Sequence, residues 1–261
     1  MKAKANGIEL NYEIHGDKGP WVVLSHSLAC DLHMWDAQID LLKDRFQVLA
    51  FDTRGHGSSD APSGAYSMAQ LVDDARGLLS ATGVDNPHWV GLSMGGMIGM
   101  EYALKYPGEF RSLVLCDTSS RIPPELAPVW AERIKTVTAQ GMQAVVPSTL
   151  ERWFTEPFRH SGNEVIGRVA DMIASTPVAG YAGCCHAIPT INCTDRLHMI
   201  GCPVQIIVGE QDAGTPVAMS EAIHAAISGS ELVVIPQASH LSNLEQPEKF
   251  NAALNGFLSS H

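Results

Sequence analysis

Apolar residues along this chain form short continuous runs that alternate with segments of helical spacing. Each run ends in glycine or polar residues, which is typical of strands buried on both faces of a sheet. The runs lie at residues 21–25, 46–51, 88–90, 112–117, 203–209 and 231–235. Helical spacing follows at Trp35, Ile39 and Leu42, at residues 68–81 before Gly83, at 97–103, and at 247–258. Strands that alternate with helices predict a mostly parallel sheet, flanked by helices and joined by right-handed crossovers.

The chain is expected to open with a β-hairpin. Residues 8–15 alternate between apolar and polar side chains, and residues 16–20 contain two glycines and a proline. A turn of this composition between two strand-like runs favours a hairpin whose second arm is residues 21–25.

The pattern changes near Ser119. A pair of prolines at 123 and 124 interrupts the chain, and the residues up to about His198 have helical apolar spacing without a convincing strand. The strand rhythm returns at residue 203. We therefore expect a core domain made of residues 1–118 and 199–261, with a helical cap at residues 119–198 inserted into it.

Composition and charge narrow the class of protein. The 261 residues are 45% apolar and 17% charged, as in an ordinary globular protein, and the formal net charge is −11. Nucleic acid and anionic membrane surfaces gain nothing from so acidic a partner, so a small-molecule substrate is expected, and an anionic one must meet a local cation. The sequence leaves the oligomeric state open.

The ends and the cysteines indicate the compartment. Residues 1–7 are polar where a signal peptide needs an apolar core, and no apolar run approaches a membrane span, so a cytoplasmic protein is expected. The six cysteines have no zinc-type spacing, which favours buried or free thiols over a disulfide framework.

Residues 91–95 match the motif Gly-x-Ser-x-Gly, with Ser93 at its centre. The motif follows an apolar run without a linker and leads into a helical pattern, which is the strand, sharp turn and helix of a nucleophile elbow. At such a turn the serine hydroxyl is exposed, and the N–H of Met94 points to where an oxyanion would form. A serine in a glycine-rich turn of any α/β protein is the alternative.

A serine hydroxyl needs an imidazole to take its proton, and the imidazole needs a carboxylate to fix its tautomer. Asp212 follows the run that ends at Gly209, and His240 follows the last strand, so the chain order is Ser, Asp, His. Asp212 could instead be a turn residue or a helix N-cap, and Glu210 is the rival acid. His26 and His56 also lie at predicted strand ends.

The second oxyanion donor is expected in the loop after residues 21–25, most simply the backbone N–H of Leu28 paired with that of Met94. Each such donor is typically worth on the order of 3 kcal/mol of barrier. This arrangement needs no metal and no cofactor, and the histidines lack a spacing such as His-Glu-x-x-His.

Four segments together resemble the α/β-hydrolase superfamily: residues 91–95, the turn at 52–59, the strand end at 209–212 and the tail at 240–247. The resemblance spans the whole chain. One departure concerns the oxyanion segment, where the usual His-Gly-x is His26-Ser27-Leu28.

Within the superfamily, residues 24–28, 31–36, 150–155 and 180–185 resemble the 3-oxoadipate enol-lactonases of aromatic-compound degradation, in the β-ketoadipate pathway. An enol-lactone carries a free carboxymethyl group, so the resemblance implies a cation in the site. Arg133, three residues after Trp130, is the candidate, although a solvated arginine on a helix face is an equal alternative. Trp130 and Trp153 are candidates for lining the pocket, or simply core residues.

Three functions remain open at this stage. The first is an enol-lactonase. The second is a general aryl or short-chain carboxylesterase, with possible perhydrolase side activity. The third is a ligand receptor on the same fold with very slow turnover. Dehalogenases and epoxide hydrolases are weaker candidates because they have an aspartate where this chain has Ser93.

Overall fold

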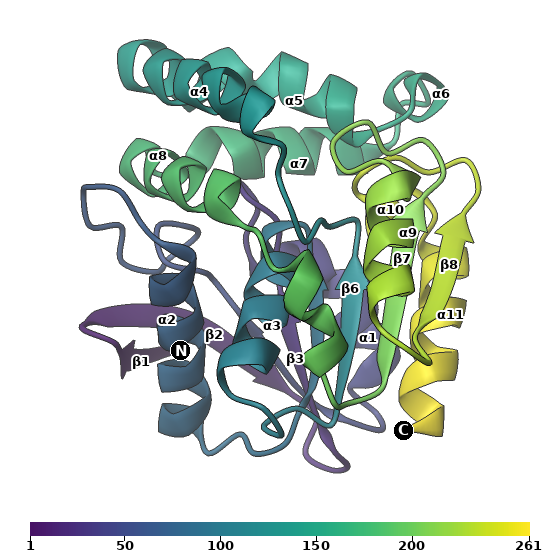
Figure 1. Cartoon of the computed structure of the whole chain (residues 1–261). Helices are drawn as coiled ribbons and strands as arrows, with labels where there is room; N and C mark the ends of the chain where they lie inside the picture. The colour runs from purple at the N-terminus through teal and green to yellow at the C-terminus, as the bar shows by residue number, and fades with distance from the viewer.

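The computed structural model describes all 261 residues, and its eight strands form one sheet in the order β1-β2-β4-β3-β5-β6-β7-β8 (Figure 1). The strands are β1 (Lys2–Ala5), β2 (Ile8–His15), β3 (Trp21–Ser25), β4 (Gln47–Phe51), β5 (His88–Leu92), β6 (Ser112–Cys116), β7 (Val204–Gly209) and β8 (Glu231–Ile235). From β4 to β8 every neighbouring pair is parallel. The predicted mostly parallel sheet is confirmed, and each apolar run became one of its strands.

The predicted opening hairpin is wrong. β2 pairs antiparallel with β1 on one side and with β4 on the other, whereas β3 lies between β4 and β5. The true hairpin turns at Asn6 and Gly7, which both have positive φ, at 46° and 83°. An Asn-Gly pair is the strongest short hairpin signal because a type I′ turn needs positive φ at both positions. The run at 16–20 is therefore a connection and not a hairpin turn.

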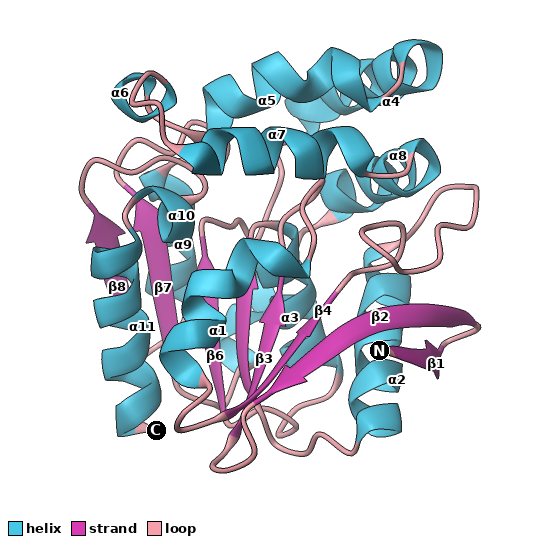
Figure 2. Cartoon of the chain, turned by 180° about the vertical axis from the view of Figure 1, so that it is seen from behind, coloured by secondary structure: helices cyan, strands magenta, loops and turns pink.

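Helices cover both faces of the sheet. α2 (Met68–Thr82), α3 (Met94–Lys105) and α9 (Val217–Ala226) lie on the face seen in Figure 1, and α1 (Asp36–Leu42) and α11 (Pro247–Ser260) lie on the face seen in Figure 2. The ends of α2 have clear local causes. Ser67 Oγ accepts the Gln70 N–H at its start, and Gly83 ends it with φ 71°.

A layer of helices lies over the carboxyl ends of the parallel strands (Figure 1). We call residues 124–190 the helical layer. It contains α4 (Ala127–Gln140), α5 (Val146–Trp153), α6 (Glu156–Arg159), α7 (Glu164–Ser175), α8 (Val178–Ala187) and the short 3-10 helices η2 (Pro124–Leu126), η3 (Met142–Val145) and η4 (Ile188–Thr190). The short helix η5 (Thr194–Met199) lies on the face of the sheet against α3 and α9. Two further short helices, η1 (Leu32–Trp35) and α10 (Ser242–Glu245), also lie outside the layer.

The helical layer and the sheet share one hydrophobic core. A single cluster of 70 buried apolar residues includes Val90 in the sheet and Val137 and Ile173 in the layer. All six cysteines are free thiols, and five of them are buried, as the sequence predicted. The chain contains no helix with both the length and the apolar character that a membrane crossing requires.

Candidate active site

Ser93 occupies a strained turn between β5 and α3. β5 ends at Leu92 and α3 begins at Met94, so Ser93 alone makes the turn, with φ 53° and ψ −111°. The glycines on either side are required by space. A Cβ on Gly91 would lie 2.2 Å from the Gly95 carbonyl oxygen, and a Cβ on Gly95 would lie 2.1 Å from the Ser25 carbonyl oxygen. Such strain in a non-glycine residue persists only when the surrounding structure imposes it.

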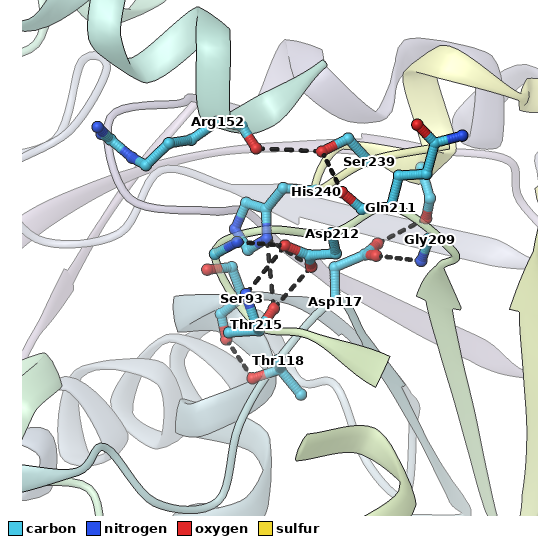
Figure 3. Close-up of polar contacts among 12 residues, drawn as sticks. Ser93, Asp117, Thr118, Arg152, Gly209, Gln211, Asp212, Thr215, Ser239 and His240 are labelled. Atoms are coloured by element: carbon cyan, nitrogen blue, oxygen red, sulfur yellow. Dashed lines mark hydrogen bonds and ion pairs between the residues drawn. The ribbon is translucent and has the colours of Figure 1, made fainter. Parts of the chain in front are cut away.

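The backbone of Ser93 is held from the neighbouring strand. Its N–H donates to the Cys116 carbonyl oxygen at 2.8 Å, and the Thr118 hydroxyl donates to the Ser93 carbonyl oxygen at 2.7 Å (Figure 3). Both partners lie at the carboxyl end of β6 or just beyond it. These bonds position the serine and leave its own hydroxyl without a role in the turn.

Asp212 and His240 meet in the loops after β7 and β8. The carboxylate Oδ2 of Asp212 lies 2.8 Å from Nδ1 of His240, and both side chains are almost fully buried (Figure 3). Asp212 also accepts the N–H groups of Gly214 and Thr215 and the Thr215 hydroxyl, at 2.7, 2.9 and 2.7 Å. Because the carboxylate accepts at Oδ2, the imidazole proton belongs on Nδ1 and Nε2 is free to accept one.

One cavity collects most of the residues singled out in the sequence. Its volume is about 200 Å³, and its walls include Ser93, His240 and Leu28. The helical layer contributes the predicted Trp130, Arg133 and Trp153 to the same walls. The Trp153 and His240 rings have their centroids 6.1 Å apart. A cavity of this size admits only a small substrate, since drug-sized ligands need about 300 Å³ or more.

The rival acid and bases have other partners. Glu210 is exposed and accepts the Gln237 N–H, away from any histidine. His26 accepts the Thr53 N–H at Nε2, and His56 accepts the Ala29 N–H at Nε2, each fully buried. These histidines hold loop backbone together. The structure thus brings together the three residues favoured by chain order and uses the rivals elsewhere.

The predicted oxyanion donors are both unengaged. No hydrogen bond in the structure uses the N–H of Leu28 or of Met94. Leu28 lies in the loop after β3, and Met94 is the first residue of α3, where N–H groups have no partner within the helix. Both N–H groups are therefore free to donate to a new acceptor, such as an anionic oxygen.

Three residues at this site were not predicted from the sequence. Thr215 bonds Asp212, and its hydroxyl lies 3.3 Å from His240 Nδ1. Arg152, on α5, lines the cavity with Arg133. Asp117, just after β6, is fully buried and accepts the Gly209 N–H at 2.7 Å. Only for Thr215 could the neighbouring sequence have indicated the contact, because a hydroxyl three residues after an aspartate commonly closes a turn.

The two arginines have no carboxylate partner. Arg152 makes one side-chain hydrogen bond, to the Thr149 hydroxyl at 3.2 Å, and Arg133 lies over the Trp130 ring with its Cζ 4.4 Å from the centroid. Neither forms a salt bridge, although the chain carries a net charge of −11. Burial and then the positive charge of Arg133 lower the pKa of Arg152. The cavity therefore holds two positive charges that form no ion pair with a carboxylate.

Asp117 is a second buried carboxyl beside the site. Burial, and then the negative charge of Asp212, raise the pKa of Asp117 well above its usual value. The Ser242 hydroxyl, at the start of α10, donates to Asp117 Oδ2 at 2.5 Å. Asp117 therefore links the end of β7 to the segment after His240.

We expect Asp117→Asn to preserve the enzyme. The asparagine oxygen keeps the bond from the Gly209 N–H, and the neutral amide carries no charge that burial penalises. Because the raised pKa of Asp117 makes the wild type lose stability as the pH rises above about 4, the variant should have the higher Tm at pH 8 and no advantage at pH 4. Asp117→Ala, which removes both bonds, should cost about 1–3 kcal/mol. Thermal melts from pH 4 to 8 measure this, and a lower Tm for Asp117→Asn at pH 8 would mean that the carboxyl is ionised.

Three comparisons with known proteins each find relatives that match most of the chain. A family model described as alpha/beta hydrolase fold matches residues 20–247. The 3-oxoadipate enol-lactonase 2 of Acinetobacter baylyi is 34% identical over 255 residues, which cover 97% of this chain and 94% of that protein. The crystal structure of the enol-lactonase from Burkholderia xenovorans LB400 is 36% identical with a TM-score of 0.95, covering 99% of this chain and 100% of that one.

An esterase is almost as similar. The structure of a thermophilic esterase from Thermogutta terrifontis, described as malate bound, is 33% identical with a TM-score of 0.94, covering 100% of this chain and 98% of that one. The similarity to all of these proteins includes the helical layer, because it extends over the whole chain.

Proposed function

We propose that this chain, which belongs to the α/β-hydrolase family and is a hydrolytic enzyme, opens a small lactone that carries a carboxylate. The specific substrate that we propose is 3-oxoadipate enol-lactone, an intermediate of aromatic-compound degradation. The relatives named as enol-lactonases support the lactone. The two arginines of the cavity, neither of which is paired with a carboxylate, support the carboxylate of the substrate.

In the proposed mechanism Ser93, Asp212 and His240 form a catalytic triad. His240 Nε2 takes the hydroxyl proton as Ser93 attacks the ring carbonyl, and Asp212 stabilises the imidazolium through the 2.8 Å bond to Nδ1. The N–H groups of Leu28 and Met94 bind the oxyanion. The C–O bond of the ring then breaks, and His240 returns the proton to the leaving oxygen. Water activated by the same histidine finally releases the acyl group from Ser93.

The observation that carries the substrate class is the pair of arginines. A half-buried guanidinium without a carboxylate partner has lost part of its hydration, and repulsion from a second guanidinium adds to that cost. A substrate carboxylate removes both penalties and can accept hydrogen bonds from the guanidinium N–H groups. Trp130 holds the Arg133 guanidinium over its ring, which fixes the direction in which this cation can point.

We expect Arg133→Met and Arg152→Met to weaken the binding of carboxylated substrates and not that of neutral ones. Each should raise KM for a carboxylated lactone by about 10- to 100-fold, since a hydrogen bond to a charged group is worth about 1.5–3 kcal/mol. KM for phenyl acetate, which has no charge, should change by no more than about threefold. Steady-state assays with the two substrates side by side measure the effect.

Arg168→Met is the matched control for these variants. Arg168 is exposed on α7 and does not line the cavity, and its Nη1 lies 3.9 Å from Asp36 Oδ2. It should leave both Michaelis constants unchanged. Equal changes of KM for the charged and the neutral substrate in Arg133→Met and Arg152→Met would show that the arginines are not a carboxylate clamp.

A carboxylesterase of neutral esters is the second candidate, favoured by the similarity to the Thermogutta terrifontis esterase. The ratio of kcat/KM for the enol-lactone to that for phenyl and short alkyl esters separates the two functions. A ratio well above one supports the lactonase, and a ratio below one supports the esterase. A ligand receptor, the third function left open by the sequence, would turn over all of them very slowly.

A further inference from the structure

Ser27 is a polar residue in the oxyanion loop whose side chain has no partner. It occupies the position where the usual His-Gly-x segment has glycine, directly before Leu28. Its relative exposure is 1%, and its Oγ has no hydrogen-bond partner in the protein. Ser27 also lines the cavity that contains Ser93 and His240. A buried hydroxyl without a partner destabilises a protein, and in a native structure it calls for an explanation.

The nearest polar side chains in this loop cannot supply the missing partner. His26 accepts the Thr53 N–H at Nε2, so its proton is on Nδ1, which donates to the Ser27 carbonyl oxygen at 2.7 Å. His56 accepts the Ala29 N–H at Nε2 and donates from Nδ1 to the Arg54 carbonyl oxygen at 3.2 Å. Burial lowers the pKa of both, to about 3 for His56, so both rings are neutral. Every ring nitrogen is thus already engaged.

Hydrogen bonds also fix the backbone of Ser27. The Ser27 N–H donates to Met34 Sδ at 3.3 Å, and its carbonyl oxygen also accepts the Cys30 N–H at 3.2 Å. Ala29, two residues on, is held at φ 59°, a left-handed value that a non-glycine residue adopts at a cost. The loop is therefore rigid before any substrate arrives, and the Ser27 side chain has only its own rotation left.

We propose that the Ser27 hydroxyl is a third oxyanion donor, which adds an O–H group to the backbone N–H groups of Leu28 and Met94. This inference rests on the proposed hydrolase mechanism at Ser93. The hydroxyl keeps its proton throughout and forms a hydrogen bond only to the negative oxygen of the tetrahedral intermediate. A dehydrated donor on a rigid backbone stabilises developing charge with only a rotation of its own hydroxyl, so little reorganisation opposes a large effect on rate.

The test uses two substitutions at Ser27 and a matched control. Ser27→Ala and Ser27→Gly both remove the hydroxyl, and glycine is the residue that the usual motif has there. Ser25→Ala makes the same chemical change at a second buried hydroxyl without a partner, two residues earlier and outside the cavity walls. The full-length proteins are assayed with phenyl acetate, and their Tm values are measured.

We expect both Ser27 variants to lower kcat by roughly 100-fold, the effect of one oxyanion donor, with KM within about threefold of the wild type. A donor used only in the transition state changes kcat and not KM. Their Tm should be unchanged or higher, because an unsatisfied buried group is lost. Ser25→Ala should keep kcat within about twofold. Phenylboronic acid forms a tetrahedral adduct with an active-site serine. Its affinity for both Ser27 variants should fall by a factor similar to the loss of kcat.

Three results would overturn the inference. The first is an unchanged kcat in Ser27→Ala. The second is a normal kcat in Ser27→Gly with a reduced one in Ser27→Ala, which would be an effect of shape. The third is a similar loss of kcat in Ser25→Ala, which would be an effect on the loop. A failure of the proposed function looks different, because the wild type would then hydrolyse phenyl acetate no faster than Ser93→Ala does.

Discussion

Ser93→Ala should lower kcat for any ester or lactone substrate by roughly 10⁴- to 10⁶-fold while the fold is retained. Alanine lacks the hydroxyl that attacks the carbonyl in the proposed mechanism, so His240 has no serine proton to take and no acyl-enzyme forms. The backbone bonds of residue 93, to Cys116 and from Thr118, do not involve the side chain that is removed. Circular dichroism and Tm should therefore stay close to those of the wild type.

Ser93→Gly is the informative companion to this variant. Both substitutions remove the nucleophile, but only glycine adopts φ 53° with ψ −111° without strain. Because a strained residue of this kind costs about 1–3 kcal/mol, we expect Ser93→Gly to melt a few degrees above Ser93→Ala. Differential scanning calorimetry compares the two, and wild-type turnover by either variant would rule out Ser93 as the nucleophile.

The nucleophile turn could be predicted from the sequence because all its causes are local. A buried run, a serine between small residues and a helical pattern are adjacent in the chain, and the space needed at Gly91 and Gly95 is set by the turn itself. The predicted α/β-hydrolase fold is confirmed by the family match over residues 20–247. The order of Ser93, Asp212 and His240 followed from that fold.

Strand pairing, in contrast, is not a local property. Residues 8–15 and 21–25 are neighbours in sequence and both are strands, but β4, more than twenty residues further on, lies between them. Nothing in the turn at 16–20 shows that a later strand is inserted there. The error came from treating two successive strands as partners, whereas a parallel strand is paired through a crossover that only the complete sheet defines.

The residues missed around the site have the same explanation. Asp117, Gly209 and Ser242 are contributed by three different strand ends, and only the folded sheet brings them within hydrogen-bond distance. Arg152 was hidden in a helix whose apolar face was recognised, because a charged residue beside that face is normally solvated. Local patterns thus predicted the groups to which we assign the chemistry in our proposal, and tertiary contacts decided which groups hold them in place.

Asp212→Asn should lower kcat by roughly 10³- to 10⁴-fold with little change in KM. An asparagine that keeps the two backbone bonds from Gly214 and Thr215 at its oxygen turns its amide N–H groups toward Nδ1 of His240. The imidazole then accepts at Nδ1 and carries its proton on Nε2, where it cannot take one from Ser93. The low-field NMR signal of the His240 Nδ1 proton should disappear in the same variant, which links the lost rate to the tautomer.

Glu210→Gln is the control that distinguishes Asp212, the proposed acid, from Glu210, the rival acid two residues earlier. Glu210 is exposed, and its one hydrogen bond, from the Gln237 N–H, can be kept by the glutamine oxygen. We therefore expect kcat within about twofold of the wild type and an unchanged NMR signal. If both amide substitutions reduced kcat equally, or if Asp212→Asn kept more than about a tenth of the rate, Asp212 would not be the residue that orients His240, because a tautomer reversal cannot be that mild.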